Sequence, residues 1–131
     1  MAASEEALTL VAEFHRLWNA KEPAALLDLA IDDIRIGGSR GSGTGKHLLE
    51  EWVSRANMTL TPQRIFARDG VVAVEQLAEW RDGTTGDVTS SQTMATTFRV
   101  DQGKFVAIAR FSHFAEAANK AGLDEDDAVN R

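Results

Sequence analysis

The sequence contains no cysteine among its 131 residues. Disulfide bonds and thiolate chemistry are therefore excluded, and the redox compartment leaves no mark on the composition. No apolar run approaches the roughly 18 residues that a membrane-spanning helix needs. The N-terminal stretch MAASEEALTL has acids where a signal peptide has a basic region. These absences lead us to expect a cytoplasmic protein without a membrane partner.

Basic residues are in the minority, with 14 Lys and Arg against 20 Asp and Glu and a net charge of −6. Nucleic-acid-binding proteins concentrate Lys and Arg on one face, so we expect no nucleic-acid partner. Residues 124–131, DEDDAVNR, contribute four acids and one base to this charge. We expect them to form a disordered acidic tail after a single domain of residues 1–123.

Histidine is also scarce, since His15, His47 and His113 are the only three in the chain. No two of them have the spacing of metal ligands, and no cluster of histidines and carboxylates accompanies them. We therefore expect no metal site and no cofactor.

Apolar periodicity divides the chain into helices followed by strands. Spacing typical of helices predicts helices over residues 4–20, from Pro23 to about residue 32, and over residues 46–58. A short strand at 34–36 comes between the last two. Segments 64–68, 71–81, 90–100 and 104–114 are rich in β-branched and aromatic residues and predict a meandering antiparallel sheet, and 115–122 predicts a closing helix. Segregated helices and strands favour an α+β domain with helices covering one face of a curved sheet.

The stretch RGSGTGKH, residues 40–47, has the look of a phosphate-binding loop. A Walker loop requires G-x-x-x-x-G-K-[ST], but Arg40 stands at its first glycine position and His47 at its last. The glycines have the spacing G-x-G-x-G, which also fails the dinucleotide pattern G-x-G-x-x-G. The stretch instead predicts a short hairpin that leads into the third helix. Its glycines would let Arg40 shift over a cavity entrance.

Three segments carry a resemblance to a known superfamily: LVAEFHRLWNAKEPAALLDLAIDDIRI, GTGKHLLEEWV and GKFVAIARFSHFAEAANKAGL. Over residues 8–123 the chain resembles the nuclear transport factor 2-like superfamily, which includes SnoaL-like polyketide cyclases, ketosteroid isomerases and limonene epoxide hydrolases. The resemblance implies a cystatin-like cone, in which a strongly curved antiparallel sheet surrounds helices and a deep pocket. It also implies a homodimer formed through the sheet.

The catalytic residues of these enzymes are missing from the matching positions. The isomerases use a Tyr and two acids, and the hydrolases use an Arg, an Asp and a second Asp. The resemblance aligns each of these positions with a residue that cannot do the same chemistry. These residues are Phe14, Gly38, Thr96, Gln76, Ala78 and Arg110. Whether the protein is an enzyme is therefore left open.

Strand alternation predicts which side chains face the concave side of the sheet. Gln76, Gln92, Thr96, Arg110 and Ser112 are polar exceptions among apolar neighbours there. Phe105, Ala107, Ala109 and Phe111 are predicted on the outer face. Combined with the aromatic residues of the helices, the concave set gives a predicted ligand-binding group of Phe14, Trp18, Trp52, Gln76, Trp80, Met94, Thr96, Phe98, Arg110 and Ser112.

Arg110 is the most informative of these residues, because a buried guanidinium stays charged and needs an anion. That anion is either an internal carboxylate, with Glu13, Asp32 and Asp33 as candidates, or a ligand. His15 is the one plausible general base near Arg110; the alternative is a histidine that flanks the helix without a catalytic role.

These features predict a pocket protein of the SnoaL-like class that binds a partly hydrophobic small molecule, which is anionic if Arg110 has no internal partner. A lyase-, isomerase- or cyclase-like reaction is one use of such a pocket. The alternative is a non-catalytic binding or dimerisation module in which Arg110 is paired internally.

Overall fold

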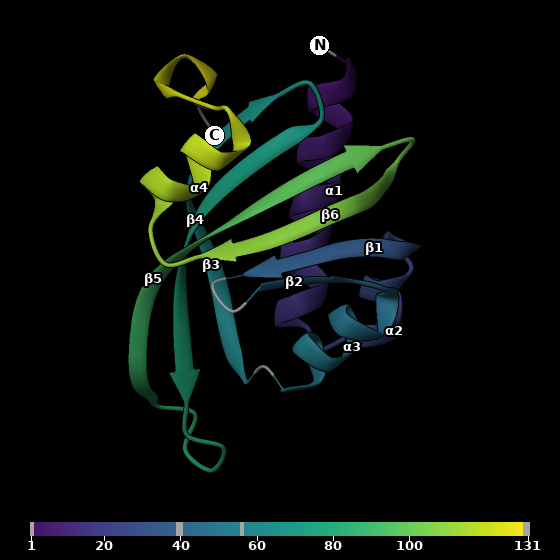
Figure 1. The fold of residues 1–131 in the computed structure, drawn as a ribbon. Coiled ribbons are helices and arrows are strands. Elements are labelled where there is room, and N and C mark those ends of the chain that lie inside the picture. Colours follow the sequence, from purple (N-terminus) through teal and green to yellow (C-terminus); the bar gives the residue numbers. More distant parts are fainter. Residues whose placement is uncertain (1, 39–40, 56, 130–131) are drawn as a thin grey trace.

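A strongly curled sheet surrounds the N-terminal helix (Figure 1). The computed structural model describes residues 2–38, 41–55 and 57–129. Within these ranges it contains α1 (Ala2–Asn19), α2 (Pro23–Leu27), β1 (Ala30–Gly38), β2 (Gly41–Thr44), α3 (Lys46–Arg55), β3 (Met58–Arg68), β4 (Val71–Arg81), β5 (Val88–Asp101), β6 (Lys104–Phe111), α4 (Phe114–Ala121) and a 3-10 turn, η1 (Glu125–Asp127). No helix in the described ranges is long and apolar enough to cross a membrane.

The six strands of the described residues follow the order β2-β1-β6-β5-β4-β3. All neighbouring pairs are antiparallel except β1 and β6, which run parallel. The predicted α+β class with a curved sheet is confirmed, and the parallel β1–β6 pair is the one departure from a purely antiparallel sheet. This pair brings the glycine-rich hairpin beside the last strand.

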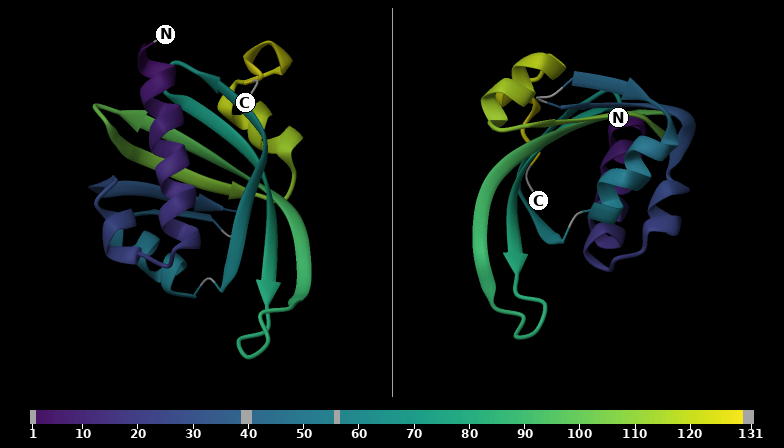
Figure 2. Two further views of the ribbon diagram at one scale, coloured as in Figure 1. Left: turned by 180° about the vertical axis from the view of Figure 1, so that it is seen from behind. Right: turned by 60° about the horizontal axis from the view of Figure 1, so that its bottom comes forward.

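The two faces of the sheet are covered by different helices (Figure 2). On the concave face α1 inserts Phe14, whose ring packs edge-on against Phe98 with 5.0 Å between centroids. On the convex face α4 packs Phe114 against Phe66, with 4.8 Å between ring centroids. Each face therefore has its own apolar cluster, and α1 fills much of the interior of the cone.

The third helix is shorter than predicted, and the strand after it is longer. The helix ends at Arg55 instead of residue 58, while β3 begins at Met58. Met58 pairs with Trp80 of β4, and the side-chain amide of Asn19 both donates to and accepts from the backbone of Leu60 at 2.8 Å. These long-range contacts override the helical spacing of the local sequence.

Phe105 lies in the core, so its predicted place on the outer face is wrong. Its side chain is completely buried, and its ring lies 5.3 Å from that of Phe98. In the pairing of β5 with β6, Arg99 lies opposite Ala107 but Val100 lies opposite Phe105. Val106 is therefore one extra residue on β6, and this bulge reverses the alternation at that end of the strand.

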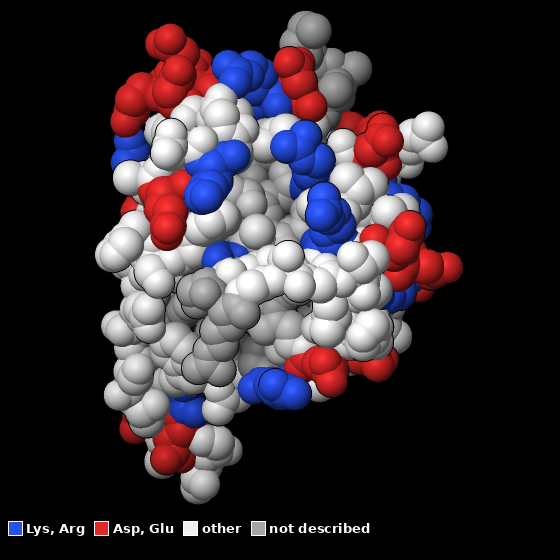
Figure 3. All heavy atoms as spheres, in the orientation of Figure 1, with Lys and Arg blue, Asp and Glu red and all other residues white. Residues whose placement is uncertain are grey.

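The acidic segment after residue 123 packs against β3 as far as the structure describes it, whereas the sequence predicted a disordered tail over residues 124–131. Asp124 caps the turn η1, and Glu125 and Asp127 form ion pairs with Arg64 and Arg68 of β3. Its acids gather over one end of the molecule (Figure 3). The segment continues along β3, where the backbone amide of Val129 donates to the carbonyl of Ile65 at 2.8 Å.

Gly70 is required by the turn between β3 and β4. Its φ angle is +84°, and a Cβ there would lie 2.9 Å from the carbonyl oxygen of Val100. Both the backbone conformation and the close approach exclude a side chain. The turn fixes the register of a hairpin that carries Gln76 into the interior.

Candidate functional site

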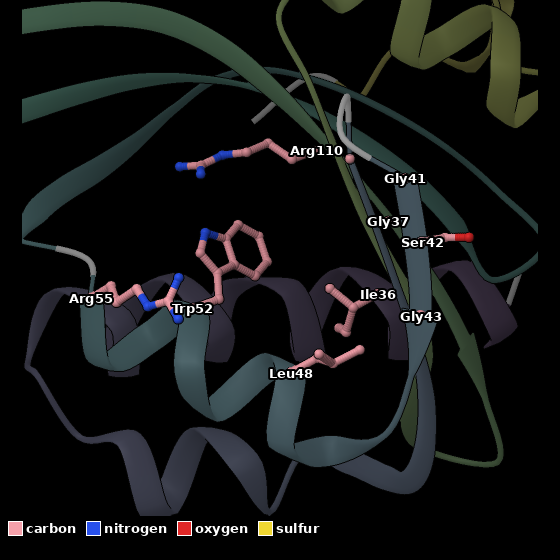
Figure 4. Close-up of a pocket in the computed structure, with 10 residues that line it drawn as sticks. Ile36, Gly37, Gly41, Ser42, Gly43, Leu48, Trp52, Arg55 and Arg110 are labelled. Atoms are coloured by element: carbon pink, nitrogen blue, oxygen red, sulfur yellow. The ribbon is translucent and has the colours of Figure 1, made fainter.

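A cavity of about 670 Å³ lies between the β1–β2 hairpin, α3 and the end of β6 (Figure 4). Its apolar lining includes Ile36, Leu48 and Trp52, and its charged lining is Arg55 and Arg110. No acidic side chain lines it among the residues that the structure describes. Ligand pockets for small molecules commonly measure about 300–1,000 Å³ and combine apolar walls with a few polar groups.

Arg110 reaches into this cavity from the end of β6. Its guanidinium carbon lies 5.0 Å from the centre of the Trp52 ring, and its Nη2 donates to the sulfur of Met58 at 3.6 Å. Burial lowers the pKa of Arg110 because the charged form loses hydration. An arginine nevertheless stays protonated at neutral pH. The cavity wall therefore holds a partly desolvated positive charge.

Within the described ranges, no carboxylate neutralises Arg110. Two of its three candidate partners are engaged elsewhere: Glu13 pairs with Arg16 at 2.6 Å, and Asp32 with Lys46 at 3.6 Å. The third, Asp33, is exposed and forms no ion pair with Arg110. These contacts therefore do not support the alternative in which an internal carboxylate pairs with Arg110.

Two buried N–H donors remain without an acceptor among the described residues, namely Nε1 of Trp52 and Nε of Arg110. Both belong to the stacked pair that lines the cavity, and the indole nitrogen of Trp52 is turned toward the guanidinium (Figure 4). Two donors that share a site both need an acceptor.

A second cavity of about 240 Å³ also has Arg110 in its wall, together with Trp80, Met94 and Ser112. The structure thus places five of the ten predicted ligand-binding residues around the two cavities that meet at Arg110. Trp18 lines a separate cavity of about 220 Å³ beside α3. The others, Phe14, Gln76, Thr96 and Phe98, are buried in the interior of the cone.

His15 belongs to a closed polar network in that interior. Its Nδ1 lies 2.8 Å from the carbonyl oxygen of Val11, so this nitrogen must be the donor. Its Nε2, lying 2.7 Å from the amide nitrogen of Gln76, then accepts. The amide oxygen of Gln76 accepts in turn from the hydroxyl of Thr96 at 2.7 Å. Every partner is used when the imidazole is neutral, and burial lowers the pKa of His15.

This arrangement gives the imidazole a structural use, because the amide of Gln76 occupies the lone pair that a general base would need. The catalytic role of His15 stays a prediction. His113 is exposed at the start of α4. In the described part of the chain, no group of three or more His, Asp or Glu side chains is arranged to hold a metal ion.

Sequence reasoning missed three parts of the cavity lining: Arg55, the Ile36 and Leu48 pair, and the glycines of the hairpin. The hairpin itself was predicted, but not that it forms a cavity wall. The G-x-G-x-G spacing was the available signal, because a period of two places all its members on one face of a strand. The predicted movement of Arg40 lies outside the described residues.

No family model matches the sequence, and no curated protein matches it. Solved structures do match. A nuclear transport factor 2-like protein of unknown function from Burkholderia pseudomallei has a TM-score of 0.70 at 14% identity, covering 87% of this chain and 95% of its own. A protein from Catenulispora acidiphila with a ketosteroid isomerase-like fold, in complex with trimethylamine, has a TM-score of 0.65 at 18% identity. The match covers 89% of this chain and 95% of that one. A computationally designed 17-OHP binder has a TM-score of 0.68 at 22% identity. The match covers 82% of this chain and 92% of that one.

The chain therefore has the nuclear transport factor 2-like fold, which confirms the resemblance predicted from its sequence. One of these similar structures is a complex with trimethylamine, and another was designed to bind 17-OHP. The fold alone does not select a ligand. The residues of this chain's own cavity must do so.

Proposed function

We propose that the protein binds a small, partly apolar anion in the 670 Å³ cavity, with Arg110 as the group that holds the negative charge. The observation that carries the proposal is the state of Arg110: a partly buried guanidinium without a carboxylate partner in the described ranges. Desolvating a charge without a counter-ion lowers stability by several kcal/mol at the extreme of full burial. A bound anion would remove that penalty.

The surroundings of Arg110 support an anion over a cation or a neutral ligand. Arg55 gives the cavity lining a second positive charge, and no described acid in the lining opposes the two. The orphaned Nε1 of Trp52 is a further donor. Ile36, Leu48 and the Trp52 ring supply apolar contacts, so the ligand combines a carboxylate or enolate with a hydrocarbon part.

The experiment is isothermal titration calorimetry with two carboxylates, 2-naphthoate and octanoate, and their neutral amides. We expect the wild type to bind both carboxylates more tightly than the amides, and Arg110→Met to weaken carboxylate binding by about 10- to 100-fold, as for the loss of a charge-assisted hydrogen bond. Arg99→Met is the matched control, since Arg99 is exposed and lies beside β6 on the neighbouring strand.

Equal binding of carboxylates and amides, or unchanged carboxylate binding in Arg110→Met, would contradict the proposal. So would the absence of binding by every probe to the wild type.

We assign no reaction to the site. The residues at the positions of family acids and bases are Phe14, Gly38, Thr96, Gln76, Ala78 and Arg110. A lyase-, isomerase- or cyclase-like activity stays a prediction that would need another proton-transfer group near Arg110.

The predicted homodimer is a second proposal, and the outer face of the sheet favours it. Ala107, Ala109 and Phe111 of β6 are only half-buried there and line a groove of about 210 Å³ with Val71. Small and apolar side chains on an open sheet face are typical of interfaces between subunits. A single monomer mass over a wide concentration range in sedimentation velocity would contradict a dimer.

A further inference from the structure

The glycines of the β1–β2 hairpin lie on the side that faces the cavity. In the antiparallel pairing Ile36 lies opposite Gly43, and Gly38 lies opposite Gly41. Paired residues share a face of the sheet, so these four positions form one side of the hairpin. Ile36 lines the cavity. Among the hairpin residues that the structure describes, three of these four positions therefore lack a side chain.

The intervening positions face the other way. A Cβ built on Gly37 would lie 3.5 Å from the Cβ of Ala109, on the outer side of β6. The side chain of Ser42 points away from Trp52 and Arg110 (Figure 4). Three of the four described positions on the cavity side are glycines, whereas on the outer side only Gly37 is a glycine among Arg35, Gly37, Ser42 and Thr44.

The fold explains two of the three glycines in this wall. Gly41 has a φ angle of +118°, which disfavours any side chain, and a Cβ on Gly43 would lie 2.7 Å from Cδ1 of Leu48. Neither a positive φ angle nor a steric contact requires glycine at position 38. Among the described atoms a Cβ on Gly38 would meet nothing closer than the carbonyl oxygen of Arg110 at 3.9 Å. What the bare position preserves is free space in the cavity next to Arg110.

An aromatic ring lines the opposite side of the cavity. The indole of Trp52 lies across from β2, with the guanidinium of Arg110 over it and Ile36 and Leu48 below (Figure 4). A peptide wall with few side chains and an indole ring therefore form two sides of a slot. Planar ring systems fill such a slot and gain aromatic contacts with the indole, whereas saturated rings are thicker.

We infer that the ligand is an aromatic carboxylate, whose ring system lies between the glycine wall of β1–β2 and Trp52 and whose carboxylate binds Arg110. Gly38 is the specificity-determining residue, because a side chain there would project from the glycine wall into the slot. The cavity volume of about 670 Å³ accommodates a fused bicyclic ring or a larger system. The inference rests on the proposed function and narrows its ligand class.

The test compares 2-naphthoate with decahydronaphthalene-2-carboxylate by calorimetry, since the two probes share their charge and carbon skeleton and differ in thickness. We expect the wild type to bind the aromatic probe at least about 10-fold more tightly, and Gly38→Val to remove most of this difference by weakening 2-naphthoate binding about 10-fold. Thr44→Ile is the matched control: Thr44 is exposed on the outer face of the hairpin and does not line the cavity, so a larger β-branched side chain there should change neither affinity more than about twofold.

The indole N–H resonances give a second readout. The chain has three tryptophans, and Trp52→Phe identifies the signal of Trp52. This signal should shift on titration with 2-naphthoate in the wild type and in Thr44→Ile, and much less in Gly38→Val. If Gly38→Val is unfolded by circular dichroism, Gly38→Ala takes its place with a smaller expected change, and the comparison of probes on the wild type still decides.

The results separate this inference from the proposed function. Equal binding of the aromatic and saturated probes, both lost in Arg110→Met, would overturn the aromatic preference and leave anion binding intact. The same holds if Gly38→Val folds and binds 2-naphthoate as the wild type does. If carboxylate affinity does not depend on Arg110, both the aromatic preference and the proposed anion binding are overturned.

Discussion

The interior of the cone and its cavity contain polar groups in opposite states. In the interior, His15, Gln76 and Thr96 satisfy one another through hydrogen bonds of 2.7 Å, and Val11 completes the chain. At the cavity, Trp52 and Arg110 stack at 5.0 Å and each keeps a buried N–H without an acceptor among the described residues. A buried polar group that the fold itself satisfies has a structural use, whereas one that it leaves unsatisfied points to a ligand. The four predictions below test that contrast.

The largest expected effect comes from breaking the interior network. Gln76→Leu removes the partner of both His15 Nε2 and Thr96 Oγ1, and each group left buried and unpaired costs about 1–3 kcal/mol. We expect the free energy of unfolding to fall by about 2–4 kcal/mol, measured by urea denaturation. Gln92→Leu is the control, because Gln92 is exposed on the same face of the sheet and should change stability by less than about 0.5 kcal/mol.

The same network predicts a dependence of stability on pH. Burial lowers the pKa of His15 in the folded protein, so the unfolded chain takes up the proton first as the pH falls. The contribution of neutral His15 is fully present above its ordinary pKa of about 6.5 and is lost as the pH falls from there toward the folded pKa. The slope of this loss is at most about 1.4 kcal/mol per pH unit, the value for one proton.

Urea denaturation between pH 8 and pH 5 measures this slope. The loss of stability below pH 6.5 should persist in His113→Gln, which changes an exposed histidine, and should be reduced in His15→Gln. A slope that is the same in all three proteins would mean that His15 is not the titrating group.

A change of the opposite sign is expected at the cavity. Arg110→Met removes a partly buried charge and keeps an apolar side chain that packs on Trp52, so the ligand-free protein should become more stable, by about 1 kcal/mol. The same substitution should weaken carboxylate binding. A large loss of stability in Arg110→Met, without any change in binding, would show that the residue is structural and that the two regions do not differ.

The smallest effect is expected at an arginine that already has a protein partner. Arg64 pairs with Glu125 and also stacks on Phe66 and Phe114, but the pair is exposed to solvent. Glu125→Gln should lower the free energy of unfolding by about 0.2–1 kcal/mol, less at 1 M salt than at 0.05 M, because water and salt screen the attraction. A loss above about 2 kcal/mol would contradict a surface role for this pair.

Much of the fold was predictable because local patterns report which face of an element is buried. The 71–81 strand was predicted with its bounds, and Val72, Val74, Gln76 and Ala78 are buried as the alternation indicated. The alternation failed at Phe105, where one extra residue in β6 changes the face. A bulge depends on pairing with the neighbouring strand, and the sequence of one strand does not specify it.

For the candidate site, the sequence identified its central residue but not its neighbours. Arg110 stood out as a charged side chain on an apolar face, and the requirement for an anion followed from its chemistry alone. That Trp52 would stack on it, and that Leu48 and three glycines would complete the wall, depends on how α3 and the β1–β2 hairpin pack. These contacts join residues far apart in the chain.

By itself, the sequence determined the α+β layering and, except at the bulged end of β6, which strand residues lie on the concave face, since apolar periodicity acts through neighbours in the chain. Only the tertiary structure decided that His15 is satisfied by a glutamine 61 positions away and that Arg110 meets no carboxylate among the described residues. Whether a buried polar group has a partner depends on distances between separate elements. The sheet register and the docking of the helices set those distances.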